Sequence, residues 1–211
     1  QTIASVARTL NKSESQIQNT SLPQLEFKIV VLGYAFVGKT NLVKALMSQP
    51  FEDWTDPALP TCHNLNLIKY DKEFCLKIWD MPGQEEYEAI IKSHLTGDLV
   101  TIVAYDITNQ DSFSQVPIWL LHRWSAKVNK EGKEMTFIVG TNSDRSEKRG
   151  VAKDRGEALA VKHGAIHIEV SSKTGDAIED LREKIVDAIE RNYSPIPVKT
   201  EKKKSFWGLF G

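Results

Sequence analysis

A glycine-framed loop that ends in a lysine and a threonine is the part of the chain best suited to chemistry. It runs from Gly33 to Thr40 in the pattern G-x-x-x-x-G-K-T, directly after the apolar run 27–32. Successive backbone N–H groups ahead of a helix N-terminus form a cradle for anions. In this pattern Lys39 reaches the terminal phosphates of a nucleotide, and the Thr40 hydroxyl ligates Mg²⁺. The context of strand, loop and helix favours a phosphate-binding loop (P-loop) over a chance glycine turn.

Three other polar segments follow predicted strands further along the chain. Asp80 ends one apolar stretch, residues 142–144 follow a second, and residues 171–173 follow a third. Ligands of parallel α/β sheets bind beyond the carboxyl ends of the strands. We therefore expect these segments to meet the P-loop on one rim of a sheet.

The elements that must position these groups alternate between strand and helix. After the strand at 27–32, apolar patterns predict strands at 65–70, 74–79, 99–105, 135–140 and 166–170. Helical spacing predicts helices at 39–47, 85–94, 111–128, 154–163 and 176–192. This order predicts an α/β fold of three layers, with a mostly parallel six-stranded sheet and one antiparallel edge strand supplied by a hairpin.

Local signals refine these elements. Residues 71–73 are expected to form the hairpin turn, and the proline-containing segment 49–61 an irregular loop. Asp111 or Ser112 should cap the helix at 111–128. Pro117 lacks an N–H, so this helix should kink there or begin its regular part later. Asp176 should cap the last helix, whose apolar stripe is Ile178, Leu181, Ile185 and Ile189.

Composition excludes several classes of protein. The 211 residues are 41% hydrophobic and 26% charged, as in an ordinary globular domain, and the net charge of −1 gives no argument for nucleic-acid binding. The two cysteines, Cys62 and Cys75, have neither metal-ligand spacing nor the number for a disulfide framework. The sequence contains neither an apolar run long enough to span a membrane nor a visible secretory signal.

The two ends of the chain differ from its centre. Residues 1–24 are polar and are expected to be a flexible lead-in, with a short helix as the alternative. Residues 194–211 form a tail in which a lysine cluster precedes Phe206, Trp207, Leu209 and Phe210. The segment 199–211 has two interpretations: it contacts an anionic membrane, or it is a linker that is disordered, truncated or packed on this or another domain. The chain begins without methionine, so we expect a trimmed sequence, and a lipidation site beyond its end stays open.

Over about residues 26–193 the sequence resembles the Ras superfamily of small GTPases. Beside the P-loop, the stretches 78–85 (IWDMPGQE) and 105–113 (YDITNQDSF) look most like the Rab branch. The resemblance implies a G-domain at 25–193 that binds GDP or GTP with Mg²⁺, hydrolyses GTP slowly and acts in vesicular membrane traffic. It also implies effector and exchange-factor contacts through 51–61 and 81–94, and a cytoplasmic location on the cytosolic face of endomembranes.

The same resemblance assigns roles to single residues. Gly83 matches the glycine whose N–H senses the γ-phosphate, and Gln84 the glutamine that orients the attacking water. Asp80 matches the carboxylate that holds Mg²⁺ through water. Phe51 matches an aromatic that stacks on guanine, although an apolar plug at a helix end is the alternative. The nucleotide-binding set implied by the resemblance is Gly33, Ala35, Val37, Gly38, Lys39, Thr40, Asn41, Phe51, Asn142, Asp144, Ser171, Ser172 and Lys173.

The segment that selects the base departs from the family pattern. The family's N-K-x-D motif is Thr141-Asn142-Ser143-Asp144 here. Asp144 can accept both N–H groups of guanine, whereas adenine would leave the carboxylate unpaired. Thr141 loses an amide contact to the purine and Asn142 loses the alkyl stem that covers the base, each at a cost on the order of 1 kcal/mol. We expect guanine selectivity with weaker nucleotide binding than in a typical member.

Two threonines compete for the switch position that contacts Mg²⁺ and the γ-phosphate. Thr61 is preferred because it follows a proline, but it lies ten residues after Phe51, which is longer than the usual interval. Thr55 is the alternative, and the length of the loop leaves open that neither engages in a given state.

Further substitutions fall close to the γ-phosphate. Ala35 stands where many relatives have glycine, Tyr34 and Phe36 are bulky for this loop, and Pro82 stiffens the hinge before Gly83. Together they predict slow intrinsic hydrolysis and a weak response to activating proteins.

Three functions remain in competition: a guanine-nucleotide switch of membrane traffic, a nucleotide-binding pseudo-GTPase that serves as a scaffold, and a different P-loop ATPase. Asp144, Phe51 and the segment 171–173 argue against the ATPase. Gly83 and Gln84 favour the switch over the scaffold, whereas Ala35, Pro82 and the altered base motif favour the scaffold.

Overall fold

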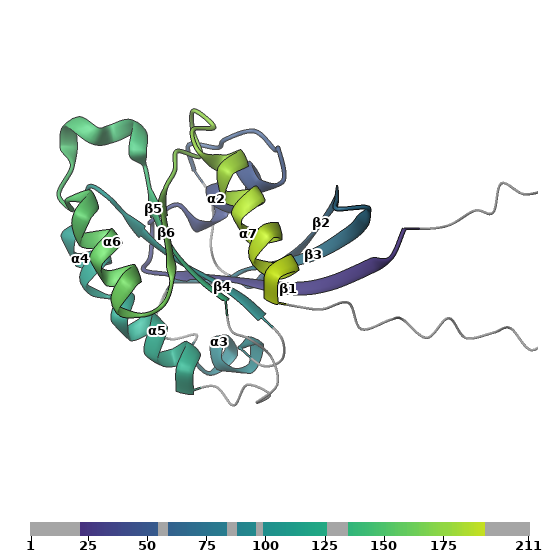
Figure 1. The fold of residues 1–211 in the computed structure, drawn as a ribbon. Coiled ribbons are helices and arrows are strands. Elements are labelled where there is room, and N and C mark those ends of the chain that lie inside the picture. Colours follow the sequence, from purple (N-terminus) through teal and green to yellow (C-terminus); the bar gives the residue numbers. More distant parts are fainter. Residues whose placement is uncertain (1–21, 55–58, 84–87, 96–98, 126–134, 193–211) are drawn as a thin grey trace, which may run out of the picture.

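The structure is a computed structural model that describes residues 22–54, 59–83, 88–95, 99–125 and 135–192. Its centre is a six-stranded sheet with the strand order β2-β3-β1-β4-β5-β6 (Figure 1). All neighbouring strands are parallel except the antiparallel pair β2 and β3, so the predicted sheet is confirmed. The strands are β1 (Gln24–Gly33), β2 (Thr61–Lys69), β3 (Lys72–Asp80), β4 (Leu99–Asp106), β5 (Met135–Thr141) and β6 (Ile166–Glu169).

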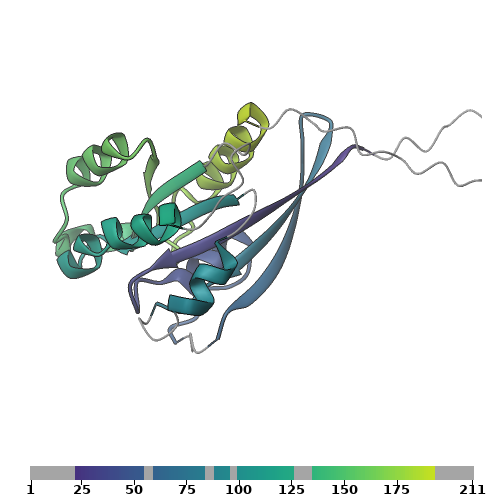
Figure 2. The ribbon, with the colours of Figure 1, turned by 90° about the horizontal axis from the view of Figure 1, so that it is seen from below.

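Helices cover both faces of this sheet, as Figures 1 and 2 show from two directions. α2 and α7 pack on one face, and α3, α5 and α6 contribute to the core on the other. The helices are α2 (Lys39–Leu46), α3 (Glu88–His94), α4 (Gln110–Ser114), α5 (Val116–Ser125), α6 (Lys153–Lys162) and α7 (Ile178–Asn192), with a 3₁₀ helix η2 (Ser143–Lys148). The three predicted layers are therefore confirmed.

The central strand β1 explains why its sequence is apolar without alternation. Successive side chains of a strand point to opposite faces. Ile29 and Val31 enter the core under α2 and α7, whereas Val30 and Leu32 enter the core on the other side. All four are fully buried, as expected for a parallel strand covered by helices on both faces.

The hairpin of β2 and β3 turns earlier than residues 71–73, so that prediction is wrong. Tyr70 and Asp71 alone form the turn, with φ of 55° and 53°. Two central residues with positive φ match the twist of the flanking strands. At the other end of the hairpin the ladder continues to Thr61, which was predicted to lie in the preceding loop and pairs with Asp80.

The helix predicted at 111–128 is two helices. Asn109 caps α4, accepting hydrogen bonds from the N–H groups of Asp111 (2.9 Å) and Ser112 (3.2 Å), so the predicted caps are wrong. The predicted effect of Pro117 is confirmed, because a regular helix restarts at Val116 and places the proline in its first turn. Residues 126–128 lie outside the described residues.

Helix α7 supports the helix that carries the P-loop. Its predicted apolar stripe is buried, although the helix begins at Ile178, two residues after the predicted cap Asp176. Arg182 donates from Nε to the Leu46 carbonyl (2.8 Å) and from Nη2 to the Ala45 carbonyl (2.9 Å). The last carbonyls of a helix lack partners within it, and here Arg182 supplies donors to two of them, with the Ser48 N–H also donating to the Ala45 carbonyl (3.0 Å).

Within the described ranges, the chain forms no helix with the length and apolar character needed to cross a membrane. The predictions for residues 1–21 and 193–211, including the tail segment 199–211, lie outside the described residues.

Candidate functional site

The P-loop connects β1 to α2 on the rim where the strands end. Gly38 precedes α2 with a left-handed backbone (φ 86°), which directs the chain into the helix. Gly33 has a φ of 143°, and a β-carbon there would collide with the carbonyl of Ala104 on β4. The loop is therefore held against the sheet, and the first N–H groups of α2 lack partners within the helix.

Lys39 is a buried cation at the centre of this loop. Its side chain donates from Nζ to the carbonyls of Gly33 (3.0 Å) and Tyr34 (2.8 Å), and the residue is only 4% exposed. Burial lowers the pKa of Lys39 to about 8, against the opposing effect of the Asp80 carboxylate. A buried ammonium group is stabilised by an anion, which a phosphate would supply.

Thr40 and Asp80 lie side by side next to this lysine. The Thr40 hydroxyl donates to Oδ2 of Asp80 (2.6 Å). Burial raises the pKa of Asp80, and the Thr40 hydrogen bond and the Lys39 charge oppose that shift. A hydroxyl and a carboxylate oxygen are hard ligands that suit Mg²⁺. The pair fits the predicted ion, with further ligands to come from phosphates and water, since the described residues include no cluster of three or more His, Cys, Asp or Glu that could hold a metal.

Gly83 lies directly over the P-loop. A β-carbon at this position would stand 2.5 Å from Nζ of Lys39 and 2.7 Å from the backbone nitrogen of Ala35. Only glycine allows the backbone to approach the phosphate cradle so closely. Pro82 is also buried, and Gln84, the predicted water-orienting residue, lies outside the described residues.

Thr61 reaches the edge of this cluster by its register in β2. Directly opposite residues of an antiparallel pair present their side chains on the same face, so Thr61 and Asp80 share one side of the sheet. The Thr61 hydroxyl lies 3.1 Å from Nε2 of His63, whose charged form would lower the pKa of Asp80. The alternative, Thr55, lies outside the described residues, so the metal role of Thr61 stays a prediction.

The base-selecting segment is tied to the P-loop by a threonine. Thr141 is 2% exposed, and its hydroxyl lies 2.6 Å from the carbonyl of Val37 and 3.0 Å from that of Tyr105. The side chain that departs from the family pattern therefore connects the two loops across 104 residues of sequence. Asn142 follows with a left-handed backbone (φ 61°).

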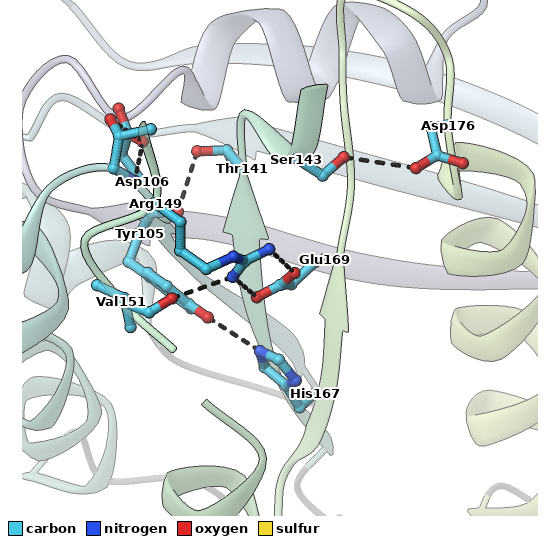
Figure 3. Close-up of polar contacts among 10 residues, drawn as sticks. Tyr105, Asp106, Thr141, Ser143, Arg149, Val151, His167, Glu169 and Asp176 are labelled. Carbon is cyan, nitrogen blue, oxygen red and sulfur yellow. Dashed lines mark hydrogen bonds and ion pairs between the residues drawn. The ribbon is translucent and has the colours of Figure 1, made fainter. Parts of the chain in front are cut away.

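Two contacts join the loops after β5 and β6, the region seen in Figure 3. Asp144 is exposed, and its Oδ1 accepts a hydrogen bond from the buried Ser171 hydroxyl (2.7 Å). At the other end of η2, Arg149 donates from both terminal nitrogens to the two carboxylate oxygens of Glu169 (2.7 Å each). Bidentate pairing of this kind adds geometric specificity. The Ser171 hydrogen bond thus orients Asp144 while its carboxylate stays open to solvent, and the Arg149–Glu169 pair ties the end of η2 to β6.

The last predicted contacts form the side of the site nearest α2. Nζ of Lys173 lies 6.0 Å from the ring centroid of Phe51, within the range of a cation–π contact. The Asn41 side chain donates to the Glu52 carbonyl (2.8 Å) and accepts from the Glu52 N–H (3.0 Å). Asn41, predicted only as a nucleotide contact, therefore fixes the loop beside Phe51. Ser172 lies half-buried between these groups and Ser171.

Sequence reasoning missed four residues of this site. Thr141 counted only as a lost contact, and the pair Arg149 and Glu169 was not singled out. Phe36 was noted for its bulk but not for its backbone, which has a φ of 61° and leaves the side chain 73% exposed. An aromatic residue in a glycine-framed loop is the one signal that could have identified Phe36 from the sequence.

The site therefore combines a buried cation with an anion cradle, a hydroxyl–carboxylate pair for a divalent cation, an exposed carboxylate, and an aromatic residue that pairs with a lysine. This arrangement can bind a purine nucleotide with phosphates at one end and a base with paired N–H donors at the other. A sequence model of the Ras family matches residues 28–191. The chain belongs to the Ras family, whose members are GTP-binding switch proteins that work with Mg²⁺ and hydrolyse GTP.

Proposed function

We propose that this protein is a Rab-like switch of vesicular membrane traffic that hydrolyses GTP slowly. The observation that carries the proposal is the packing of Gly83 against Lys39 and Ala35. A segment that closes over the phosphate cradle can sense whether a γ-phosphate is present, because the phosphate must fit beneath it.

Different residues of the rim bind the phosphates, the base and the metal ion. Lys39 and the N–H groups of the P-loop hold the phosphates, and Asp144 accepts the N–H groups of guanine. Thr40 and Asp80 hold Mg²⁺, which when bound neutralises negative charge on the phosphates. Gly83 donates its N–H to the γ-phosphate, and Gln84 orients the attacking water, as the resemblance implies.

The residues around Gly83 favour slow hydrolysis. The methyl group of Ala35 occupies space that a glycine would leave free beside the γ-phosphate, and Pro82 is buried and restricts the hinge before Gly83. Pro82 reduces the movement of the segment 81–83. Ala35 reduces the access of a catalytic group from an activating protein.

Single-turnover hydrolysis tests this part of the proposal. GTP-loaded protein should release phosphate more slowly than ordinary small GTPases, and Ala35→Gly should raise the rate several-fold. Lys153→Ala, at an exposed position of α6, is the matched surface control. A rate in the ordinary range that Ala35→Gly leaves unchanged would reject slow hydrolysis.

The role in traffic needs a separate test. Effectors and exchange factors are expected to use 51–61 and 81–94, and the lysine-rich segment 199–211 to contact anionic membrane on the cytosolic face of endomembranes. The 211-residue chain should sediment with vesicles containing anionic lipid, and removal of 199–211 should abolish sedimentation. Equal recovery of the two forms, or recovery with neutral vesicles, would count against the membrane role.

The base-selecting segment favours a second candidate, a pseudo-GTPase that binds nucleotide and serves as a scaffold. The Thr141 hydroxyl contacts the carbonyls of Val37 and Tyr105, so it is not free to bind the purine. The nucleotide that co-purifies decides between the two candidates. Bound GDP with measurable turnover supports the switch, whereas trapped GTP or an empty site without turnover supports the scaffold.

A further inference from the structure

Phe36 occupies an unusual position in the P-loop. Its φ of 61° lies in the left-handed region, which L-residues with bulky side chains rarely adopt. The side chain is 73% exposed, so burial against the rest of the described structure does not offset the strain. Strained residues of this kind gather where a ligand is bound.

A hydrogen bond brings Phe36 next to the base-selecting segment. Phe36 precedes Val37, whose carbonyl accepts from the Thr141 hydroxyl at 2.6 Å, and Thr141 precedes Asn142. Phe36 and Asn142 are therefore each next in sequence to a residue of this hydrogen bond. Both have a backbone φ of 61°. The backbone of Phe36 therefore lies close to the segment that leads to Asp144, and its ring is exposed.

The other groups of the base site leave one side of a bound purine without cover. Nζ of Lys173 lies 6.0 Å from the ring centroid of Phe51, and Asp144, which accepts from Ser171, is the group proposed to meet the polar edge of guanine. The side next to Asn142 has only a short amide side chain, which makes no capping hydrogen bond to η2.

We infer that the ring of Phe36 packs against the nucleoside of a bound guanine nucleotide, on the side of Asn142. Phe36 is then a nucleotide-binding residue that covers apolar surface which a short side chain at 142 leaves open. Stacking of an aromatic ring on a base is favourable for any purine, so Phe36 contributes affinity and Asp144 contributes selectivity. The inference rests on the binding of guanine nucleotide at this site.

The variant Phe36→Gly tests the inference because strain and ligand contact predict opposite results. Glycine adopts a φ of 61° without strain, so the nucleotide-free variant should be more stable, with Tm raised by about 2–4 °C. If the ring contacts the nucleoside, GDP binding should nevertheless weaken by about tenfold. Binding of inorganic pyrophosphate, which has no nucleoside, should stay unchanged, and Phe36→Tyr should keep the affinity for GDP.

Tyr70→Gly is the matched control. Tyr70 is also an exposed aromatic residue with a left-handed backbone (φ 55°), but it lies in the turn of the β2–β3 hairpin. This variant should leave the affinity for GDP unchanged.

A double-mutant cycle locates the contact. Asn142→Lys adds an alkyl stem on the same side of the base, so it should raise GDP affinity strongly in the Phe36→Gly background and weakly in the parent. Equal GDP affinity of parent and Phe36→Gly, an equal loss for pyrophosphate, or an additive cycle would overturn the inference. If the parent itself fails to bind guanine nucleotide, the proposed function fails with it.

Discussion

The two halves of the nucleotide site differ in how their polar groups are satisfied. In the phosphate half, Lys39 and Asp80 are buried. Burial lowers the pKa of Lys39 and raises the pKa of Asp80, so it favours the neutral form of each side chain. In the base half, Asp144 is exposed and accepts from Ser171, while Arg149 and Glu169 satisfy one another. The phosphate half gains most from a charged ligand, whereas the base half is organised without one.

This difference separates affinity from specificity. A buried charge with only partial partners is costly, and a ligand that relieves the cost binds tightly. A carboxylate that is oriented in advance discriminates between ligands, because no reorganisation offsets the penalty for a wrong base. We therefore expect substitutions in the phosphate half to change affinity for every nucleotide, and those in the base half to act on stability and selectivity.

The largest expected effect is that of Lys39→Ala. The variant removes the only cation that contacts the P-loop carbonyls in the described structure. Affinity for GDP should fall by roughly 100-fold, which corresponds to about 3 kcal/mol for charge-assisted hydrogen bonds. Isothermal titration would measure the loss, with Lys153→Ala as the control. An effect below about fivefold would show that the two halves do not differ as described.

Arg149→Met should act mainly on stability. It leaves the Glu169 carboxylate, whose side chain is 8% exposed, without its bidentate partner. We expect the free energy of unfolding to fall by about 2 kcal/mol, measured by urea denaturation without nucleotide. GDP affinity should fall far less than in Lys39→Ala. Arg145→Met, at an exposed position of the same 3₁₀ helix, is the control.

The pH dependence of binding follows from the pKa of Lys39, which is about 8 in the free protein. Phosphate binds the ammonium form, so the bound state keeps a proton that the free state releases as the pH rises through 8. Between pH 7.5 and 9 the Kd for GDP should therefore increase about eightfold. Lys39→Arg should remove this dependence, because arginine stays charged. A flat profile for the parent would contradict the lowered pKa.

The sign is opposite for stability. The pKa of Lys39 is lower in the folded state than in the unfolded chain, so the unfolded state binds more protons between about pH 8 and 10.5. Lys39 should therefore make the free energy of unfolding of the nucleotide-free protein increase as the pH rises from about 8 to 10.5. Comparison with Lys39→Met in denaturation experiments isolates the contribution, and equal slopes for both proteins would refute it.

The smallest expected effect is that of Ser171→Ala. It removes one hydrogen bond to Asp144, worth about 1 kcal/mol, so GDP affinity should fall several-fold while pyrophosphate binding stays unchanged. Competition with ATP would show whether selectivity falls as well. Thr174→Ala is the control, because the Thr174 side chain donates nothing to Asp144 among the contacts described. Loss of pyrophosphate binding in Ser171→Ala would indicate that the halves are coupled.

The strands and helices, and the chemistry of the phosphate half, could be predicted from the amino-acid sequence. The G-x-x-x-x-G-K-T pattern, the apolar run of β1 and the stripe of α7 depend on neighbours a few residues apart, so spacing alone identifies them. The convergence of the strand ends also followed from the sequence, because parallel strands end on one rim. Loop and cap details were less accessible: the hairpin turn and the cap Asn109 depend on competition between adjacent residues.

The contacts that join the two halves depend on the folded chain and could not be predicted from its sequence. From the sequence, Thr141 is only the loss of an amide contact to the purine. In the structure it links the two loops, because β5 places its hydroxyl 2.6 Å from the Val37 carbonyl. The same bond makes Phe36 a neighbour of the base-selecting segment. The partners in that bond are 104 residues apart, and no local pattern records such a distance. The physical cause is that β1 and β5 both pair in parallel with β4, so the loops that follow them meet on one rim of the sheet. The phosphate-binding loop thereby becomes one wall of a nucleotide site.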